Sequence, residues 1–188
     1  MNDNGQADRS GLWRPLRAFL QPACSVSHPP LRTADKVDIK RFMGDWCVVA
    51  CIPTVMERDA FSAVESYSLN DDGTVATQYS FNKGAYSGGR KTVTSKGYVD
   101  AQGSGAIWQM QLFGLIRADF RIVYIDDDYT QAIIGREKRD YVWILSRTSD
   151  LSPGDYFELV RRVREQGYDT NRLREVPHRR RVPVRRAA

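Results

Sequence analysis

The amino-acid sequence predicts an all-β protein: an eight-stranded antiparallel up-and-down β-barrel with a C-terminal α-helix packed on its wall. Two observations predict this fold. Between Trp46 and Ser146, apolar-rich runs of strand length alternate with turn-forming residues at short intervals, as in barrels and sandwiches. From Ser152 to Gly167, apolar side chains instead recur at helical spacing. Sequential antiparallel strands remove their exposed edges by closing into a barrel.

The elements follow in order after a short helical turn at residues 37–43, which Gly44 ends. Turn signals such as Asn70-Asp71-Asp72-Gly73 separate the strands. Ser152-Pro153 then opens the helix, which presents Leu159 and Val163 on one face and stops at Gly167. We expect the strands at residues 46–52, 63–69, 74–82, 90–100, 106–112, 119–125, 129–136 and 141–146.

Residues 1–36 lack a periodic pattern and are expected to form a flexible leader before the barrel domain at 37–177. Within the leader, Leu16–Leu20 precedes Ala23-Cys24, an order that resembles a bacterial lipoprotein signal whose Cys24 is lipidated. Arg17 interrupts the apolar run, which is shorter than the usual length of about 7–15 residues. A degenerate lipoprotein-type signal and a plain leader both remain open.

The positive charge is concentrated at the C-terminus. The net charge is +5, and five arginines of the last eleven residues equal the whole excess. We expect residues 178–188 to be a disordered basic tail, either solvated or attached to an anionic membrane surface. Nucleic-acid-binding domains usually carry basic residues on the folded face, so no nucleic-acid partner is predicted. The tail arginines are Arg179, Arg180, Arg181, Arg185 and Arg186.

The residues present argue against two further classes of protein, membrane-spanning proteins and enzymes. No stretch approaches the roughly 20 apolar residues of a membrane-spanning helix. The only histidines, His28 and His178, lie in the predicted leader and tail, and the barrel contains no nucleophile–base arrangement. The acidic run Asp126–Asp128 is typical of a solvated turn. We therefore predict no enzyme activity, no cofactor and no metal site.

Three short motifs occur in a characteristic order. Gly44-Asp45-Trp46 opens the first strand, Asp127-Asp128-Tyr129 follows the sixth, and Tyr141–Arg147 forms the last. Together they resemble the three signature motifs of the lipocalin family, over roughly residues 37–177. The run Asp140–Thr148 and Gln166–Asp169 is similar to the apolipoprotein D-like branch, particularly the bacterial outer-membrane lipocalins.

The resemblance implies binding, storage or transport of a small hydrophobic ligand, such as a fatty acid or lysophospholipid, in the barrel. It also implies a cell-envelope location, in the periplasm or at the outer membrane. Separately, lipidated Cys24 or the basic tail offers a means of association with a membrane surface. A cytoplasmic location follows if the N-terminal signal does not function. Oligomeric state is left open.

One end of the barrel is expected to be plugged by a structural group. Gly44 and Trp46 belong to the first motif, and the resemblance places Arg147 on the Trp46 ring. A guanidinium stacked on an indole gains a cation–π contact of about 0.5–2 kcal/mol. We therefore assign these three residues to the barrel base and not to ligand contact.

Strand alternation predicts the lining of the barrel, because successive side chains point to opposite faces. On 106–112, Trp108 and Met110 form the larger set and are predicted to face inward. The family resemblance places Tyr67 and Trp143 in the pocket, and alternation then adds Glu65, a carboxyl group that is costly to bury without a partner. Further predicted lining residues are Thr77, Tyr79, Tyr98, Phe120, Ile122 and Tyr124.

Two alternatives to ligand binding remain. The first is an envelope-associated scaffold or interaction module whose basic tail does the binding. The second is an isomerase or oxidoreductase of a lipophilic substrate that uses Cys47 or Cys51, although alternation from Trp46 places both thiols outside the cup. The loop at 53–61, with Val55, is expected to act as a flexible lid over the mouth.

Overall fold

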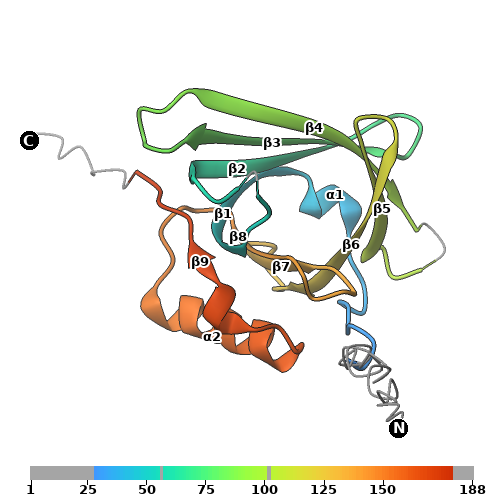
Figure 1. Cartoon of the computed structure of the whole chain (residues 1–188). Coiled ribbons are helices and arrows are strands. Elements are labelled where there is room, and N and C mark those ends of the chain that lie inside the picture. Colours follow the sequence, from blue (N-terminus) through green and yellow to red (C-terminus); the bar gives the residue numbers. More distant parts are fainter. Residues whose placement is uncertain (1–27, 56, 101–102, 180–188) are drawn as a thin grey trace, which may run out of the picture.

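The computed structural model of the chain describes residues 28–55, 57–100 and 103–179. Within them, eight antiparallel strands form a closed barrel with one C-terminal helix on its outside, as predicted (Figure 1). The strands are β1 (Gly44–Ile52), β2 (Ala60–Leu69), β3 (Val75–Lys83), β4 (Arg90–Val99), β5 (Ile107–Leu112), β6 (Ile116–Ile125), β7 (Gln131–Gly135) and β8 (Val142–Ser146).

Strand β1 closes the barrel. The strands from β2 to β8 each pair with the next along the chain, while β1 pairs with β8 on one edge and with β2 on the other. The contact with β2 covers only the first half of β1, from Gly44↔Tyr67 to Cys47↔Val64. The register between β1 and β8 shifts between Val48 and Ala50, as expected of a β-bulge.

A short segment fills the seam where β1 and β2 separate. Strand β9 (Arg174–Glu175) pairs with Ala50 and Cys51 of β1. Val176 donates from its backbone N–H to Val49 O at 2.9 Å and buries its side chain in the interior cluster. This two-residue strand was not predicted, and it holds the C-terminal segment on the barrel wall.

The helix α2 (Pro153–Glu165) covers the outside of the barrel (Figure 1). Ser152 caps it by accepting a hydrogen bond from the Asp155 backbone N–H at 3.1 Å, which satisfies one of the free donors of the first turn. Leu159 and Val163 are fully buried against the wall in a cluster with Val49, Ile133 and Ile144. The turn η1 (Thr170–Arg172) then leads the chain to β9.

The helix α1 (Ile39–Phe42) lies across one end of the barrel (Figure 1). The Asp38 carboxylate caps it, accepting from the backbone N–H groups of Lys40 and Arg41. Its one fully buried residue, Phe42, points into the interior cluster. This end of the barrel is therefore closed by an apolar side chain as well as by backbone.

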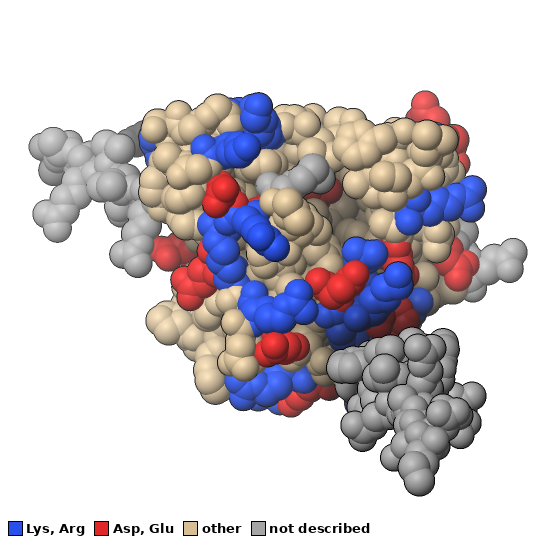
Figure 2. Space-filling model, viewed as in Figure 1, with Lys and Arg blue, Asp and Glu red and all other residues tan. Residues whose placement is uncertain are grey.

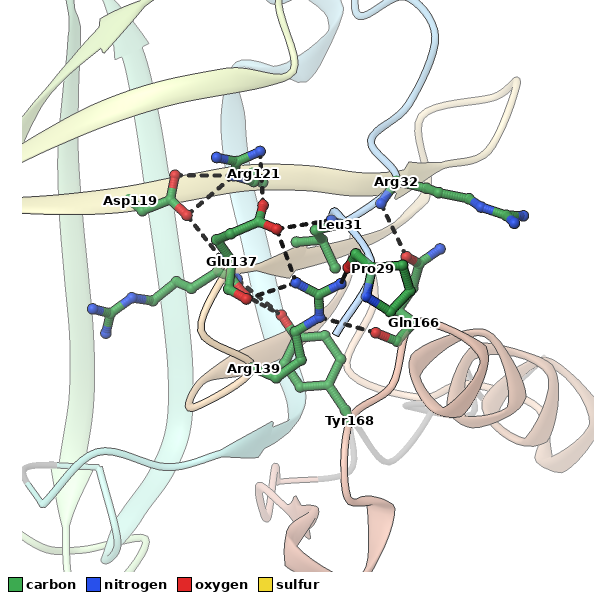
Figure 3. A network of polar contacts seen from close by, with 10 residues as sticks. Pro29, Leu31, Arg32, Asp119, Arg121, Glu137, Arg139, Gln166 and Tyr168 are labelled. Atoms are coloured by element: carbon green, nitrogen blue, oxygen red, sulfur yellow. Dashed lines mark hydrogen bonds and ion pairs between the residues drawn. The ribbon is translucent and has the colours of Figure 1, made fainter. Parts of the chain in front are cut away.

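Residues 28–36 differ from the flexible leader that was expected, because they pack on the wall (Figure 3). Leu31 is buried in the outer cluster, and its backbone N–H donates to Glu137 Oε1 at 3.0 Å. The buried Arg139 guanidinium donates to Pro29 O at 2.7 Å and to Gln166 O at 3.0 Å. One arginine thus joins the N-terminal segment to the end of α2. The predicted lipidation site, Cys24, lies outside the described residues.

Residues 178 and 179, which were expected to belong to a disordered tail, contact the barrel. His178 Nε2 lies 2.9 Å from Val48 O, and the Arg179 guanidinium lies 5.9 Å from the Tyr86 ring centre. The other tail arginines lie outside the described residues. On the face shown in Figure 2, Lys and Arg side chains are interspersed with Asp and Glu. No described helix is long and apolar enough to cross a membrane.

Candidate functional site

The closed end of the barrel is built around Trp46 and Arg147. Trp46 is fully buried, and its indole N–H donates to Phe42 O at 2.8 Å. The Arg147 guanidinium carbon lies 3.8 Å from the Trp46 ring centre, which is a cation–π distance. The structure therefore brings these two side chains together as the sequence predicts.

Arg147 also donates hydrogen bonds to several backbone carbonyl groups at the base of the barrel. Its guanidinium donates to Asp45 O at 2.9 Å, to Met43 O at 2.8 Å and to Tyr129 O at 3.2 Å, with further bonds to Arg41 O and Phe42 O. Gly44 lies beside it with φ +95°, and a Cβ there would meet Arg147 Nη1 at 3.3 Å. Only glycine adopts this backbone conformation without strain, so the glycine of the first motif makes room for the arginine of the third.

The acidic turn after β6 supports the same base. Asp126 accepts from the backbone N–H groups of Thr130 and Gln131 at 2.8 and 2.6 Å, which closes the turn. The Tyr129 hydroxyl accepts from the Asp38 backbone N–H at 2.7 Å, and Arg41 stacks on the Tyr129 ring at 4.2 Å. The turn is therefore a structural support for α1. No group of three or more metal-ligating residues occurs in the described part of the chain.

Above the base lies an aromatic floor formed by Phe42, Tyr67, Trp108 and Phe120. Trp108 and Phe120 stack with ring centres 4.9 Å apart, and Tyr67 meets both rings edge-on. The Trp108 indole N–H is satisfied by Gly105 O at 2.7 Å. Three predicted lining residues, Tyr67, Trp108 and Phe120, thus belong to the floor, while Ile122 is fully buried in the same interior cluster.

A cavity of about 170 Å³ lies between the floor and the open end. This is smaller than the roughly 300–1,000 Å³ of common ligand pockets, so it suits a slender molecule. Five predicted lining residues border it: Glu65, Tyr79, Met110, Phe120 and Trp143. The other lining residues are Thr54, Glu57, Phe81, Val93, Ser95, Leu112, Ala118, Asp119, Arg136 and Tyr141.

Polar groups beside the cavity form a short chain. Thr77, a predicted lining residue, is buried but does not border the cavity itself; its hydroxyl lies 2.5 Å from the Ser95 hydroxyl and also hydrogen-bonds the Glu65 carboxyl. Glu65 is only 4% exposed, and Tyr79 lies directly opposite it on β3. Desolvation by burial holds the pKa of the Glu65 carboxyl well above its usual range, and the nearby Glu57 raises it further. Burial therefore favours the uncharged acid.

Glu57 holds the loop between β1 and β2 against the mouth of the cavity. Its Oε1 accepts from the Trp143 indole N–H at 3.0 Å and from the Tyr141 hydroxyl at 3.1 Å. Its Oε2 accepts from the Thr54 backbone N–H at 2.8 Å. The loop expected to act as a lid is thus attached to the cavity wall by a buried carboxylate, while Val55 is exposed.

The prediction that Tyr98 and Tyr124 line the cavity is wrong, because both side chains lie on the outer face of the barrel. Tyr98 is 45% exposed on the outer face of β4, where its hydroxyl donates to Gln111. The inward position belongs to Gly97, where an added Cβ would lie 3.2 Å from both Met110 and Trp108. Alternation favoured Tyr98 because a glycine carries no apolar side chain to mark the inner face.

Tyr124 also faces outward, because β6 contains a register shift between Ile122 and Tyr124. It packs in the outer cluster, where the Arg162 guanidinium of α2 stacks on its ring at 4.2 Å. A β-bulge inserts one extra residue and so reverses the alternation beyond it. Ile122 precedes the shift and faces inward as predicted.

A register shift also makes the prediction for Cys51 wrong. Cys47 packs against the outer cluster as expected, but Cys51 follows the shift in β1 and lies in the interior cluster. Desolvation raises the pKa of the Cys51 thiol to about 12. A thiol is a nucleophile as the thiolate, so this position disfavours a catalytic role.

Several cavity residues were missed from the sequence. Tyr141 shares the inward face of Trp143 and could have been found by the alternation that was applied to Trp143. Val93 and Ser95 are likewise in phase with Gly97 on β4. Glu57 comes from an irregular loop, and no sequence pattern marks it as a partner of the cavity wall.

Comparison with known proteins gives the same architecture. The family model of the lipocalin-like domain matches residues 37–178. The outer membrane lipoprotein Blc of Citrobacter freundii is 30% identical over 161 residues, which cover 83% of this chain and 89% of that protein. The temperature-induced lipocalin-1 of Arabidopsis thaliana is 29% identical over 150 residues, 75% of this chain and 79% of the relative.

Solved structures resemble the chain in fold. Insecticyanin from the tobacco hornworm Manduca sexta superposes with a TM-score of 0.62 at 14% identity, covering 80% of this chain and 85% of that one. Lobster apocrustacyanin A1 has a TM-score of 0.60 at 13% identity, covering 82% and 94%.

Proposed function

Because the chain belongs to the lipocalin family, we propose that its barrel binds, stores or transports a small hydrophobic ligand of the fatty acid or lysophospholipid type. The observation that carries this proposal is the cavity above the aromatic floor, which is open to the exterior at the end opposite Trp46. An acyl chain gains roughly 0.8 kcal/mol for each methylene that it buries. About ten buried methylenes therefore support micromolar affinity before the loss of chain entropy.

The cavity walls suit the tail of such a ligand. Tyr79 stacks on Trp143 with ring centres 5.2 Å apart, and Phe81 packs beside Tyr79 at the same distance. Met110 on β5 and Phe120 on β6 provide apolar surface on another part of the cavity wall. A planar or extended apolar group fits between flat rings of this kind.

The rim of the cavity suits a head group. Arg136 borders the cavity, and its ion pair with Asp140 is long, at 3.6 Å. The tip of the β5–β6 hairpin beyond Leu112 exposes Phe113, Leu115 and Ile116. A ligand with its tail inside would hold an anionic head near Arg136 and enter across an apolar rim.

Native mass spectrometry of the purified full-length chain, followed by organic extraction, tests the proposal. A one-to-one complex that releases a fatty acid or lysophospholipid is the expected result. Oleate and lysophosphatidylcholine are then titrated while Trp fluorescence is recorded, since Trp143 borders the cavity. An empty barrel whose fluorescence responds to neither lipid overturns the lipid proposal.

A blocked cavity provides the matched control. Ala118 lines the cavity, whereas Thr94 is exposed on the outer face of β4. Ala118→Phe is expected to reduce lipid affinity at least tenfold, a change of about 1.4 kcal/mol. Thr94→Phe adds a similar ring outside and is expected to bind normally; equal binding by both variants would place the lipid elsewhere.

A further inference from the structure

Three buried polar atoms at the inner end of the cavity lack a hydrogen-bond partner among the described residues. They are Glu65 Oε2, Tyr67 Oη and Tyr79 Oη. The three residues are 4%, 1% and 8% exposed, so water outside the barrel does not reach them freely. Buried polar groups in proteins are nearly always hydrogen-bonded, and an exception calls for an explanation.

The three atoms belong to one small region of the barrel. Glu65 and Tyr79 are directly opposite each other in the β2–β3 ladder, and both border the cavity. Tyr67 follows Glu65 by two residues, so it faces the same way and forms part of the floor. Side chains directly opposite on paired strands have Cβ atoms about 4.5–5.5 Å apart. A ligand group in the cavity can therefore reach Glu65 and Tyr79, which border it directly, whereas Tyr67 lies in the floor and does not line the cavity.

The other buried atoms without a hydrogen bond in the described part of the chain, Arg136 Nε, Glu137 Oε2 and Arg162 Nε, each belong to an ion pair. Glu57 lies at the mouth, and both of its oxygens accept hydrogen bonds from protein groups. Glu65 has one hydroxyl partner, Thr77, and forms no ion pair with a described Lys or Arg. Its burial without a cation raises its pKa well above the usual range. An uncharged carboxyl group can both donate and accept a hydrogen bond.

We propose that Glu65 and Tyr79, the two of these residues that border the cavity, bind an uncharged hydroxyl group at the buried end of the ligand. This inference rests on the proposed function and narrows its ligand class to lipids that are oxygenated at the inner end. A hydroxyl donates one hydrogen bond and accepts others, which matches an uncharged carboxyl group and a phenol. A ligand carboxylate in this position would be buried without a described Lys or Arg paired with Glu65 to balance it, and burial of an unpaired charge is costly.

A matched pair of fatty acids tests the inference. Dodecanoate and 12-hydroxydodecanoate share the carboxylate that would lie at the mouth and differ only at the inner end. In an apolar pocket the added hydroxyl weakens binding, because it is desolvated without a partner. Here we expect the full-length protein to bind the hydroxy acid roughly tenfold more tightly, as measured by calorimetric titration. Hexadecanoate and 16-hydroxyhexadecanoate repeat the comparison at a second chain length.

Two variants assign the preference to the cluster. Glu65→Leu is expected to reverse it, so that the plain acid binds more tightly than the hydroxy acid. Tyr79→Phe removes one hydroxyl at nearly constant shape and is expected to reduce the preference severalfold. Tyr98→Phe is the control, since the Tyr98 hydroxyl lies outside the barrel and bonds Gln111; its preference should equal that of the unmodified protein.

The outcomes separate this inference from the proposed function. If the acids bind but the plain acid is preferred at both chain lengths, the inference is wrong while lipid binding stands. If 12-aminododecanoate binds more tightly than the hydroxy acid, the cluster selects a cation and the hydroxyl assignment is overturned. If no acid binds to the unmodified protein, the proposed function fails and the inference fails with it.

Discussion

Replacing Glu65 with leucine is expected to stabilise the ligand-free protein. The Glu65 carboxyl is 4% exposed, and its Oε2 has no partner among the described residues. Leucine has a similar length and needs no hydrogen bond, and Thr77 keeps its contact with the Ser95 hydroxyl. An unsatisfied buried polar group costs about 1–3 kcal/mol. We therefore expect Glu65→Leu to raise the free energy of unfolding by about that amount at pH 7.

The gain should depend on pH in a defined direction. The folded-state pKa of Glu65 is raised well above 4.5, so the unfolded chain loses this proton at a lower pH than the folded protein does. The contribution of the protonated Glu65 to the free energy of unfolding is then fully present below pH 4.5. It falls as the pH rises toward the folded-state pKa. The slope of this contribution is at most about 1.4 kcal/mol for each pH unit. Leucine removes it, so the advantage of the variant grows with pH.

Urea unfolding followed by Trp fluorescence at pH 5, 6, 7 and 8 measures both effects. Glu57→Leu is the matched control, because its carboxylate accepts from Tyr141, Trp143 and Thr54. Removing these acceptors should destabilise the protein by about 1–3 kcal/mol. If Glu65→Leu also destabilises the protein, or if its advantage is constant from pH 5 to 8, the reasoning is refuted.

Three further predictions concern the base and the cysteines. Arg147→Lys keeps the charge but loses the planar fork over Trp46, and should cost about 2–3 kcal/mol, a fall in Tm of roughly 5–10 °C by calorimetry. An unchanged Tm would contradict the bonding at the base. Gly44→Ala forces a side chain into φ +95° and should cost about 1–2 kcal/mol in the same measurement; a neutral result would show that the backbone relaxes. Cys51 is buried, so in a variant with Cys24 and Cys47 changed to serine a thiol reagent at pH 8 should label it only after unfolding. Rapid labelling of the folded protein would refute its inward placement.

Much of the barrel could be predicted because the sequence patterns that specify its strands and turns are local. Each strand alternates or is continuously apolar, and short turn signals separate the strands, so the order of elements follows from the printed sequence. The base could also be predicted, since Gly44, Trp46 and Arg147 belong to motifs with a characteristic order. The family resemblance placed Trp143 on the cavity side, and alternation from Tyr67 added Glu65, in a part of β2 without a register shift.

The wrong predictions of inward or outward placement occur where a register shift interrupts the alternation of side chains, or where a glycine carries no side chain to reveal it. Tyr124 and Cys51 follow register shifts in β6 and β1, which reverse the inner and outer faces. Tyr98 was chosen over Gly97 because glycine has no side chain to identify its face. A β-bulge is decided by pairing with neighbouring strands, so single-strand patterns do not reveal it.

Other features depend on contacts that are remote in sequence. Glu57 meets Trp143 across 86 positions, and Leu31 meets Glu137 across 106. β9 contains two residues and exists because β1 and β2 separate beside it. Neither a loop carboxylate nor a two-residue strand has a sequence signature of its own.

The distribution of satisfied polar groups divides the barrel interior into two layers with different roles. In the base, the indole N–H groups of Trp46 and Trp108 and the Arg147 guanidinium all bond backbone carbonyls. In the layer above, Glu65 and Tyr79 expose polar atoms to the cavity without partners. If the inner layer served stability alone, apolar side chains there would be better, because they leave nothing unsatisfied. Natural proteins depart from such local rules mainly at functional sites. The boundary between the two layers, at Tyr67, therefore separates the stabilising plug from the proposed binding site.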